Sequence, residues 1–504
     1  MRAAAIFSNH MVLQREKRIC IWGDGSDGER ITAELGDQTA ETVVESGAWK
    51  LYFAPMAAAD GLVLTLRGEE DIVQFEDISI GEVWLCGGQS NMEFEIRNER
   101  NGKQLLENLS PACGVRFYYT PKQRMKDADF EETERNTSWE LATPEGAQAW
   151  SAVGLYFALE VQKRLGVTVG LIGCNWGGTT AYAWIPWDTA AEHRSLLPYL
   201  KEYSTALRGK TLEQHIMEYD AYQVYQCAWD KRMHEYYAKN PSATWNEIQR
   251  ECGKSMYPGP MGPKNEMRPG GLYNTMLRRI CPYSLRGFLY YQGESDDSRP
   301  DCYETLLTAL ITKWRNDFGD DELPFLYVQL PMFRVSDEPD YKHWCKIREA
   351  QLSVYKTMKN TGLAVISDCG ELDNIHPTDK STVGHRLALQ ALCEVYGMAS
   401  RAEAIPPMYH DYYVKRDKMT LYFENPCGGF VWRGNPAGFE IAGADKEFYP
   451  AQAFLDKYEI TLSSPKVPVP KYARYAWTNY MQVSLFGTNG LPVSPFRTSR
   501  NDEK

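Results

Sequence analysis

The stretch WLCGGQSNMEF, residues 84–94, decides the fold and raises the first question about function. An apolar run at 83–86 followed by two glycines predicts a buried strand that ends in a tight turn. Ser90-x-x-Glu93 is typical of a helix start, where the Ser90 hydroxyl would cap the helix as part of a capping box. The same hydroxyl can also point out of the sheet as a nucleophile, at a helix N-terminus that stabilises a developing anion. The two interpretations are compatible, and the rest of the chain must show whether the second also holds.

Four further apolar runs follow residue 94, and helical patterns separate them. The runs are 167–174, 285–291, 324–329 and 363–367, and two of the helical patterns are 149–165 and 303–314. Nearly continuous apolar strands alternating with helices are typical of a parallel sheet covered on both faces. We therefore predict an α/β fold with three layers, α/β/α. Ligands of such sheets bind beyond the carboxyl ends of the strands, so functional residues are expected directly after each strand.

The pattern of predicted secondary structure changes twice along the chain, from strands to alternating strands and helices and back to strands, which predicts three domains. Short strand patterns and Gly-containing turns predict a small β-sandwich at 1–80. The α/β domain spans 81–400 and contains a charged, tyrosine-rich block at about 188–270, which we predict to be a helical insertion. The insertion ends in the Gly/Pro/Met loop 256–271, and long loops of this kind usually overhang a site. The β texture returns at 401–504.

Composition and charge limit the partners of the protein. The chain has 504 residues, of which 43% are hydrophobic, and a net charge of −12 that gives nucleic acid no basic surface to bind. No apolar run approaches the ~20 residues of a membrane span. Residues 1–14 lack the apolar core of a secretion signal, so we expect a cytoplasmic protein or a chain whose leader has been removed. The 12 cysteines include no C-x-x-C pair, and several lie in apolar strand-like runs, which favours reduced, buried thiols over disulfides.

Polar or glycine-rich segments follow four of the predicted strands, at 87–92, 173–179, 291–296 and 368–377. An ester hydrolase needs a serine, a base that can accept its proton, and donors for the tetrahedral oxyanion. We interpret Ser90 as the serine and His376 as the base. His376 lies between a strand and a helix, and Pro377 favours an extended backbone that lets its ring project from a loop. Asp373 is expected to accept a hydrogen bond from the second ring nitrogen and to hold the tautomer.

The second and third segments supply candidate oxyanion donors. Gly177 and Gly178 allow a backbone N–H to approach a ligand closely, although two glycines can also mark no more than a tight turn. Gln292 carries a side-chain amide that can donate to an oxyanion, and Glu294 could orient it. Ser90 is not in a G-x-S-x-G elbow, because Met92 replaces the second glycine. No metal-binding spacing such as H-E-x-x-H occurs, so we expect neither a metal nor an organic cofactor.

Six ordered blocks make the chain recognisable: NHMVLQREKRICIWG, GEVWLCGGQSNM, GLIGCNWGGTTAYAWIP, GFLYYQGESD, IHPTDKSTVGHRLAL and LPVSPFRT. Together they resemble the sialate O-acetylesterase family of the SGNH hydrolase superfamily, over nearly the whole chain. The resemblance implies a flavodoxin-like SGNH domain beside jelly-roll-like β segments. It also implies Ser90 as nucleophile, His376 as base, and the N–H groups of Ser90 and of Gly177 or Gly178 as oxyanion donors. Gln292 lies where SGNH enzymes more generally use an asparagine.

This chain departs from the family pattern at the acid that orients the base. Family members often place it directly before the Ile-His pair, where this chain has Asn374. Asp373 fits the D-x-x-H spacing of the wider superfamily. Asp368, at the carboxyl end of its strand, is the alternative acid. A Ser-His dyad assisted by a backbone carbonyl is the third option.

The resemblance implies removal of acetyl groups from sugar hydroxyls through an acyl-enzyme, with an O-acetylated sialate as the substrate. Gln89, Asn91, Trp176 and Glu294 are expected to contact this substrate, and the helical insertion to supply either substrate contacts or the contact of a homodimer. The nearest alternative keeps the chemistry but acts on acetylated xylan or mannan fragments. A non-catalytic carbohydrate-binding protein is the alternative from another class. A glycosidase that uses Glu294 with Asp296 or Asp373 is a third.

Overall fold

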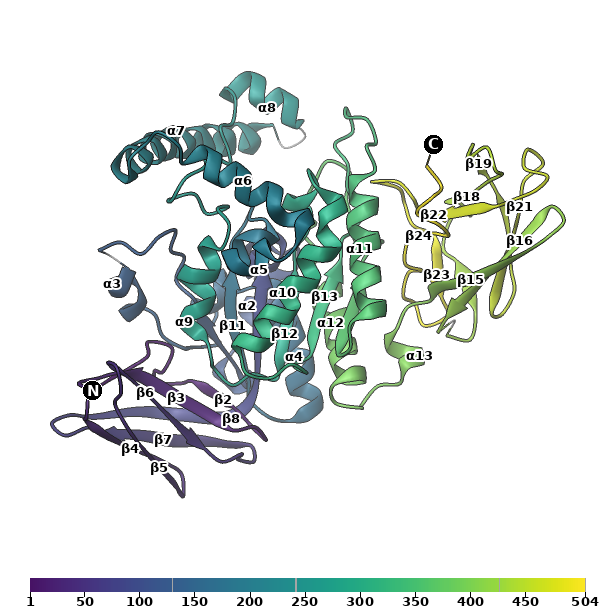
Figure 1. The fold of residues 1–504 in the computed structure, drawn as a ribbon. Coiled ribbons are helices and arrows are strands. Elements are labelled where there is room, and N and C mark those ends of the chain that lie inside the picture. Colours follow the sequence, from purple (N-terminus) through teal and green to yellow (C-terminus); the bar gives the residue numbers. More distant parts are fainter. Residues whose placement is uncertain (129, 241–242, 426, 504) are drawn as a thin grey trace.

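The centre of the molecule is a parallel sheet (Figure 1). The computed structural model describes residues 1–128, 130–240, 243–425 and 427–503. Six strands pair in parallel in the order β9-β11-β8-β12-β13-β14, and the short β10 adds an antiparallel edge to β9. Their bounds are β8 Ile72–Gly88, β9 Val115–Tyr119, β10 Glu140–Leu141, β11 Val169–Asn175, β12 Gly287–Tyr291, β13 Phe325–Gln329 and β14 Thr361–Val365. The α/β fold predicted from the apolar runs is confirmed.

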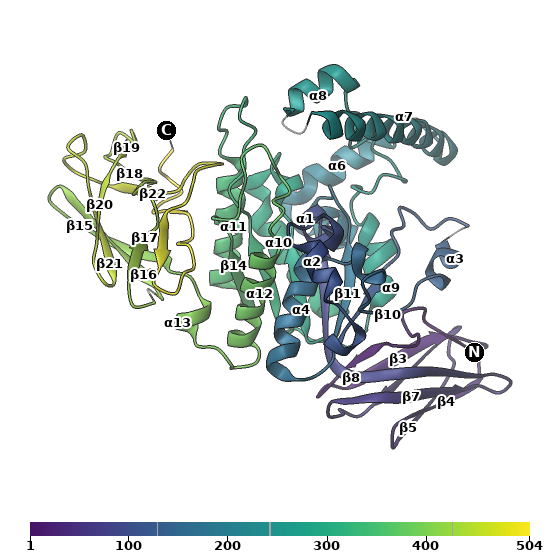
Figure 2. The ribbon, with the colours of Figure 1, turned by 180° about the vertical axis from the view of Figure 1, so that it is seen from behind.

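Helices cover both faces of this sheet and complete three layers. α4 (Ala152–Leu165) and α12 (Ser381–Glu394) pack together on one face, and α10 (Tyr303–Asp317) and α11 (His343–Thr357) on the other (Figure 2). Gly384 allows α12 to approach α4 closely, because a Cβ atom there would lie 2.9 Å from the Val153 carbonyl oxygen. Shorter helices surround these layers: α2 Gly102–Glu107, α3 Phe130–Arg135, α9 Arg278–Ile280 and α13 Arg401–Ala404.

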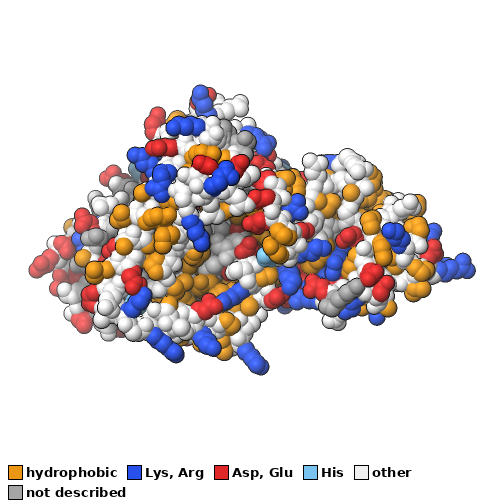
Figure 3. Space-filling model, turned by 90° about the horizontal axis from the view of Figure 1, so that it is seen from above, with side chains coloured by type: hydrophobic (Ala, Val, Ile, Leu, Met, Phe, Trp, Pro, Cys, Tyr) orange, Lys and Arg blue, Asp and Glu red, His pale blue; other side chains and the backbone are white. Residues whose placement is uncertain are grey.

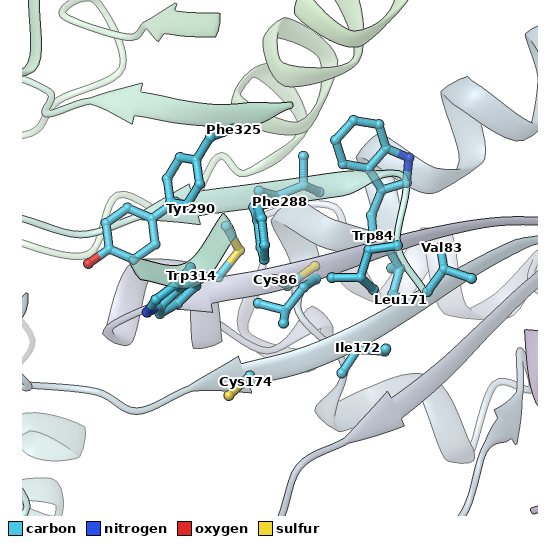
Figure 4. Packing of buried hydrophobic residues seen from close by; sticks show 14 of the residues in the cluster. Val83, Trp84, Cys86, Leu171, Ile172, Cys174, Phe288, Tyr290, Trp314 and Phe325 are labelled. Carbon is cyan, nitrogen blue, oxygen red and sulfur yellow. The ribbon is translucent and has the colours of Figure 1, made fainter. Parts of the chain in front are cut away.

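The carboxyl half of β8 is packed on both sides by large side chains. Figure 4 shows the Trp314 ring against this strand, with Phe288 and Tyr290 from β12 beside it. The ring centroids of Phe288 and Tyr290 lie 5.7 and 5.8 Å from that of Trp314. A Cβ atom at Gly87 would lie 2.8 Å from the Trp314 ring, so this close packing requires glycine. On the other side, Trp84 makes an edge contact with Phe157 of α4 at 5.1 Å.

The N-terminal part of the chain forms a separate small sheet, β1-β3-β6, and a second group of strands, β2, β4, β5 and β7, that is continuous with the central sheet through the long strand β8. The first half of β8 pairs with β7 and β2, and its second half enters the central sheet. The boundary predicted between residues 80 and 81 therefore falls inside one continuous strand. The bounds are β1 Arg2–Ala3, β2 Val12–Gln14, β3 Ile19–Asp24, β4 Arg30–Leu35, β5 Gln38–Val43, β6 Ala48–Phe53 and β7 Ala59–Arg67.

The C-terminal part is again made of strands and has its own apolar core, which includes Met419, Leu421, Ile460 and Leu462. The main sheet has the order β15-β16-β21-β20, and smaller sheets pair β17 with β23 and β18 with β19 and β22. The bounds are β15 Met408–Lys415, β16 Lys418–Glu424, β17 Phe430–Trp432, β18 Phe439–Ala442, β19 Tyr449–Pro450, β20 Gln452–Leu455, β21 Glu459–Ser463, β22 Tyr472–Tyr475, β23 Leu485–Gly487 and β24 Phe496–Arg497.

The helical insertion contains α6 (Leu197–Ala206), α7 (Leu212–Lys239) and α8 (Trp245–Cys252), and the short α5 (Trp187–Ala191) precedes them. α7 and α8 lie outside the layered core, at the top of Figure 1. They pack on each other around Trp229, Ile248 and Cys252.

None of the helices within the described ranges is long and apolar enough to cross a membrane. All 12 cysteines are free, and Cys86 and Cys174 are fully buried in the sheet.

Gly384→Ala tests the contact between α12 and α4. Alanine favours a helix over glycine by about 1 kcal/mol, but the added Cβ atom would meet the Val153 carbonyl oxygen at 2.9 Å. We expect the steric cost to win, lowering the free energy of unfolding by about 1–3 kcal/mol and the urea midpoint with it. A midpoint that stays the same or rises would show that the two helices are not closely packed.

Candidate active site

The structure brings Ser90 and His376 into direct contact at the carboxyl edge of the sheet. Ser90 is the first residue of α1 (Ser90–Glu93), directly after the turn that ends β8. Its Oγ atom lies 2.8 Å from Nε2 of His376, which lies in the loop between β14 and α12. The capping-box interpretation of Ser90 is wrong. The helix starts one residue too early for it, with Gln89 in the capping position, and Glu93 bonds elsewhere.

His376 is partly buried and is held in its neutral form. Burial, and to a lesser degree the charge of Lys380, lower the pKa of His376 from 6.5 to about 4. At neutral pH its Nε2 can therefore accept a proton from Ser90. The main-chain N–H of His376 donates to Asn374 Oδ1 at 3.0 Å.

Neither predicted acid reaches the imidazole of His376. Asp373 has a left-handed backbone, with φ of 64°, and its carboxylate accepts from the Ser336 N–H at 2.6 Å. Asp368 forms a bidentate ion pair with Arg386, with distances of 2.5 Å from Nη1 to Oδ1 and 2.7 Å from Nη2 to Oδ2. Among the described residues, no carboxylate is hydrogen-bonded to the His376 ring. The expected roles of Asp373 and Asp368 are corrected accordingly.

A buried polar network holds the His376 loop instead. Asn91 donates from Nδ2 to the Ile375 carbonyl oxygen at 2.9 Å and to Glu294 Oε1 at 2.7 Å. Its Oδ1 accepts from Lys380 Nζ at 2.5 Å. Asn91 and Glu294 were expected to contact substrate, but they are 0% and 4% exposed and face each other inside the protein. Burial raises the pKa of the Glu294 carboxyl, whose Oε2 atom has no hydrogen-bond partner.

Lys380 is a member of the site that the sequence pattern did not single out. It is 1% exposed, and burial lowers its pKa to about 8. Its ammonium group lies 4.6 Å from the centre of the Phe94 ring and 5.6 Å from that of Tyr291. A lysine directly before an apolar helix, four residues after a candidate base, was the available signal. Only the fold shows that it points inward.

Gln89 and Gln292 bond each other and are buried. Gln292 Nε2 donates to Gln89 Oε1 at 3.2 Å, to the Thr179 carbonyl oxygen at 3.3 Å and to Asp296 Oδ2 at 2.5 Å. Gln89 Oε1 also accepts from the Ser295 N–H at 3.1 Å. Because its amide hydrogens are already engaged, Gln292 is not an oxyanion donor here, and Gln89 holds the loop after β12 rather than a substrate.

The glycine turn after β11 lies against Ser90. A Cβ atom at Gly177 would lie 3.3 Å from Ser90 Cβ. The Gly177 N–H, however, donates to Glu93 Oε2 at 2.6 Å, so it is not free for an oxyanion. Gly178 has a positive φ of 75°, and no described residue accepts from its N–H. The Ser90 N–H, in the first turn of α1, also lacks an intrahelical acceptor.

Trp176 precedes this turn and carries two cations on its ring. Arg124 lies 4.9 Å and Lys122 lies 5.6 Å from the ring centre. Figure 3 looks onto this end of the molecule and shows acidic and basic side chains interspersed over the surface. In the described ranges, no group of three or more His, Cys, Asp or Glu side chains is placed to hold a metal ion.

Comparisons with known proteins show similarity to carbohydrate esterases. Residues 262–393 match the family described as carbohydrate esterase, sialic acid-specific acetylesterase. The chain is 25% identical to the sialate O-acetylesterase of Mus musculus, over 98% of this chain and 94% of that protein. It is 26% identical to that of Pongo abelii, over 98% and 92%. A crystal structure of a carbohydrate acetylesterase from Xanthomonas citri covers 99% of both chains at 28% identity and a TM-score of 0.79. The resemblance to sialate O-acetylesterases that the six sequence blocks indicated is confirmed.

The low pKa of His376 predicts an unusual pH profile. The predicted base acts in its neutral form, so activity should be lost only as pH falls through about 4. The acidic limb of kcat/KM reports the free enzyme. Measured on an acetyl ester, this limb should have its midpoint near pH 4 to 5. A midpoint at the ordinary histidine value of 6.5 would contradict the partly buried, neutral His376.

Lys380→Met should move this limb toward higher pH. The buried ammonium disfavours a second positive charge on His376, and removing it should raise the midpoint by about one pH unit. The exposed Lys103→Met is the matched control and should leave the profile unchanged. An unmoved limb in Lys380→Met would show that the charge of Lys380 does not act on the base.

Proposed function

We propose that this chain, which carries a sialic acid-specific acetylesterase domain, is a serine O-acetylesterase of the SGNH, flavodoxin-like type in which Ser90 is the nucleophile and His376 the base. The 2.8 Å contact between Ser90 Oγ and His376 Nε2 carries this proposal. Its place at the carboxyl edge of a parallel sheet supports it, because ligands of such sheets bind there.

In the first half of the reaction, Ser90 Oγ attacks the acetyl carbonyl carbon while His376 Nε2 takes the hydroxyl proton. The negative charge moves to the carbonyl oxygen, where the N–H groups of Ser90 and Gly178 receive it. When the tetrahedral intermediate collapses, the bond to the sugar oxygen breaks and His376 returns its proton to that oxygen. The deacetylated sugar leaves, and an acetyl group remains on Ser90.

In the second half, water replaces the sugar. His376 takes a proton from water, the resulting hydroxide attacks the acetyl carbonyl, and the bond to Ser90 Oγ breaks. Ser90 regains the proton from His376, and acetic acid leaves. Ser90 and His376 act as a dyad, with Asn91 and Asn374 holding the histidine loop in place of an acid.

The substrate we propose is an O-acetylated sialate, because the curated relatives carry that name. Lys122 and Arg124 lie over Trp176, but each is already ion-paired, Lys122 with Glu93 and Arg124 with Glu266, so the choice of sialate rests on these relatives. A neutral acetylated oligosaccharide, such as a xylan or mannan fragment, is the second candidate. It is favoured by the structural match to an enzyme described only as a carbohydrate acetylesterase.

Acetate release from 9-O-acetylated sialic acid, compared with acetylated xylo- and manno-oligosaccharides, tests both chemistry and substrate. Ser90→Ala should lower kcat by at least about 10³-fold while leaving the melting temperature unchanged. Ser336→Ala, which keeps the main-chain N–H that bonds Asp373, is the control and should turn over normally. Acetate release from the neutral sugars alone would support the mechanism but show that the substrate is a neutral oligosaccharide. Equal activity in wild type and Ser90→Ala would overturn the mechanism.

A further inference from the structure

Two hydrogen bonds flank a single peptide unit beside the nucleophile. Glu93 Oε2 accepts from the Gly177 N–H at 2.6 Å, and the Tyr257 hydroxyl donates to the Gly178 carbonyl oxygen at 2.6 Å. These two groups belong to the peptide units on either side of the one that joins Gly177 to Gly178. With both neighbours fixed, the orientation of the middle unit is fixed too. Its N–H, that of Gly178, has no acceptor among the described residues.

The Glu93 bond is rigid because α1 carries both the carboxylate and the nucleophile. Ser90 begins this helix and Glu93 ends it. The other carboxylate oxygen, Oε1, accepts from Lys122 Nζ at 2.5 Å, and hydrogen bonds between opposite charges are stronger than neutral ones. The distance between Ser90 and Gly177 is therefore set by one short helix and one charge-assisted hydrogen bond.

The Tyr257 bond comes from the helical insertion. The loop that carries Tyr257 is tied to α7 at several points. Tyr225 donates to the Lys254 carbonyl oxygen at 2.7 Å, and Trp229 donates to that of Gly253 at 2.5 Å. Burial raises the pKa of Tyr257 well above the ordinary tyrosine value, so its hydroxyl remains a donor.

We propose that Glu93 and Tyr257 are positioning residues that clamp the Gly177–Gly178 turn, so that the Gly178 N–H, together with that of Ser90, forms the oxyanion site. The proposal rests on the esterase function above and goes beyond it. In this proposal the helical insertion completes the catalytic geometry, because its Tyr257 hydroxyl holds the Gly178 carbonyl group. Gly178 must then be glycine for two reasons: its φ is 75°, and a Cβ atom there would lie 2.0 Å from the Tyr257 oxygen.

The test uses the full-length enzyme and p-nitrophenyl acetate, whose leaving group makes no sugar contacts. Tyr257→Phe should lower kcat about tenfold and Glu93→Ala about 10- to 100-fold, with KM changed by no more than about twofold, because the clamp acts on the transition state. Glu93→Gln should retain most of kcat, since its amide oxygen can still accept from the Gly177 N–H. The rate of inactivation by diethyl p-nitrophenyl phosphate, which also develops charge on an oxygen in this site, should fall in parallel with kcat.

Tyr412→Phe is the matched control. It removes a hydroxyl-to-carbonyl hydrogen bond, to Lys471 at 3.4 Å, in the C-terminal part and away from the glycine turn, and its kcat should stay within about twofold of wild type. An equal loss in Tyr412→Phe and Tyr257→Phe would overturn the specific role of Tyr257. A rise of kcat in Glu93→Ala would show that Glu93 blocks an oxyanion donor rather than positions one. If the wild-type enzyme released no p-nitrophenol, the proposed esterase function itself would be wrong. Failure of the esterase proposal can thus be told apart from failure of the clamp proposal.

Discussion

The backbone turn at Gly87 and Gly88 is the constraint on which the rest of the site depends. Gly88 has a φ of 134°, and a Cβ atom there would lie 2.1 Å from the Tyr291 carbonyl oxygen. The turn then bonds to both neighbouring strand ends: Gly88 accepts from the Trp176 N–H at 3.1 Å, and the Gln89 N–H donates to Tyr291 at 3.1 Å. The start of α1 and the glycine turn after β11 are thereby placed side by side.

In this site, buried polar groups hold the histidine loop in place, a task that an acidic residue performs in a Ser-His-Asp triad. Asn91 links the histidine loop to Glu294 and Lys380, all three of them nearly inaccessible to solvent. Burying polar groups is costly unless they are paired, so such a network allows few alternative arrangements. The same burial keeps the imidazole neutral, and so ready to accept a proton, at neutral pH. Orientation and protonation state of the base thus come from one arrangement.

Sequence patterns predicted the parts of this molecule that depend on local chemistry. The central sheet follows from the apolar runs of the sequence. Ser90 and His376 were identifiable because strand ends meet at one edge of a parallel sheet. The predictions that failed concern side chains whose partners come from distant segments. Asn91 bonds Glu294 inside the protein, and Gln292 bonds Gln89 and Asp296. Asp373 turns away from the His376 ring because its backbone is left-handed. The contacts that Glu93, Tyr257 and Lys380 make in the site could not be predicted for the same reason.

The central claim, that Ser90 carries the acyl group, is tested most directly by trapping it. Enzyme mixed with excess p-nitrophenyl acetate, quenched in acid within a turnover and digested, should show the mass of one acetyl group on the peptide that contains Ser90. Because acid protonates His376 and stops deacylation, the adduct should survive the quench. An acetyl group on another residue, or turnover with no acetylated peptide at all, would contradict the account.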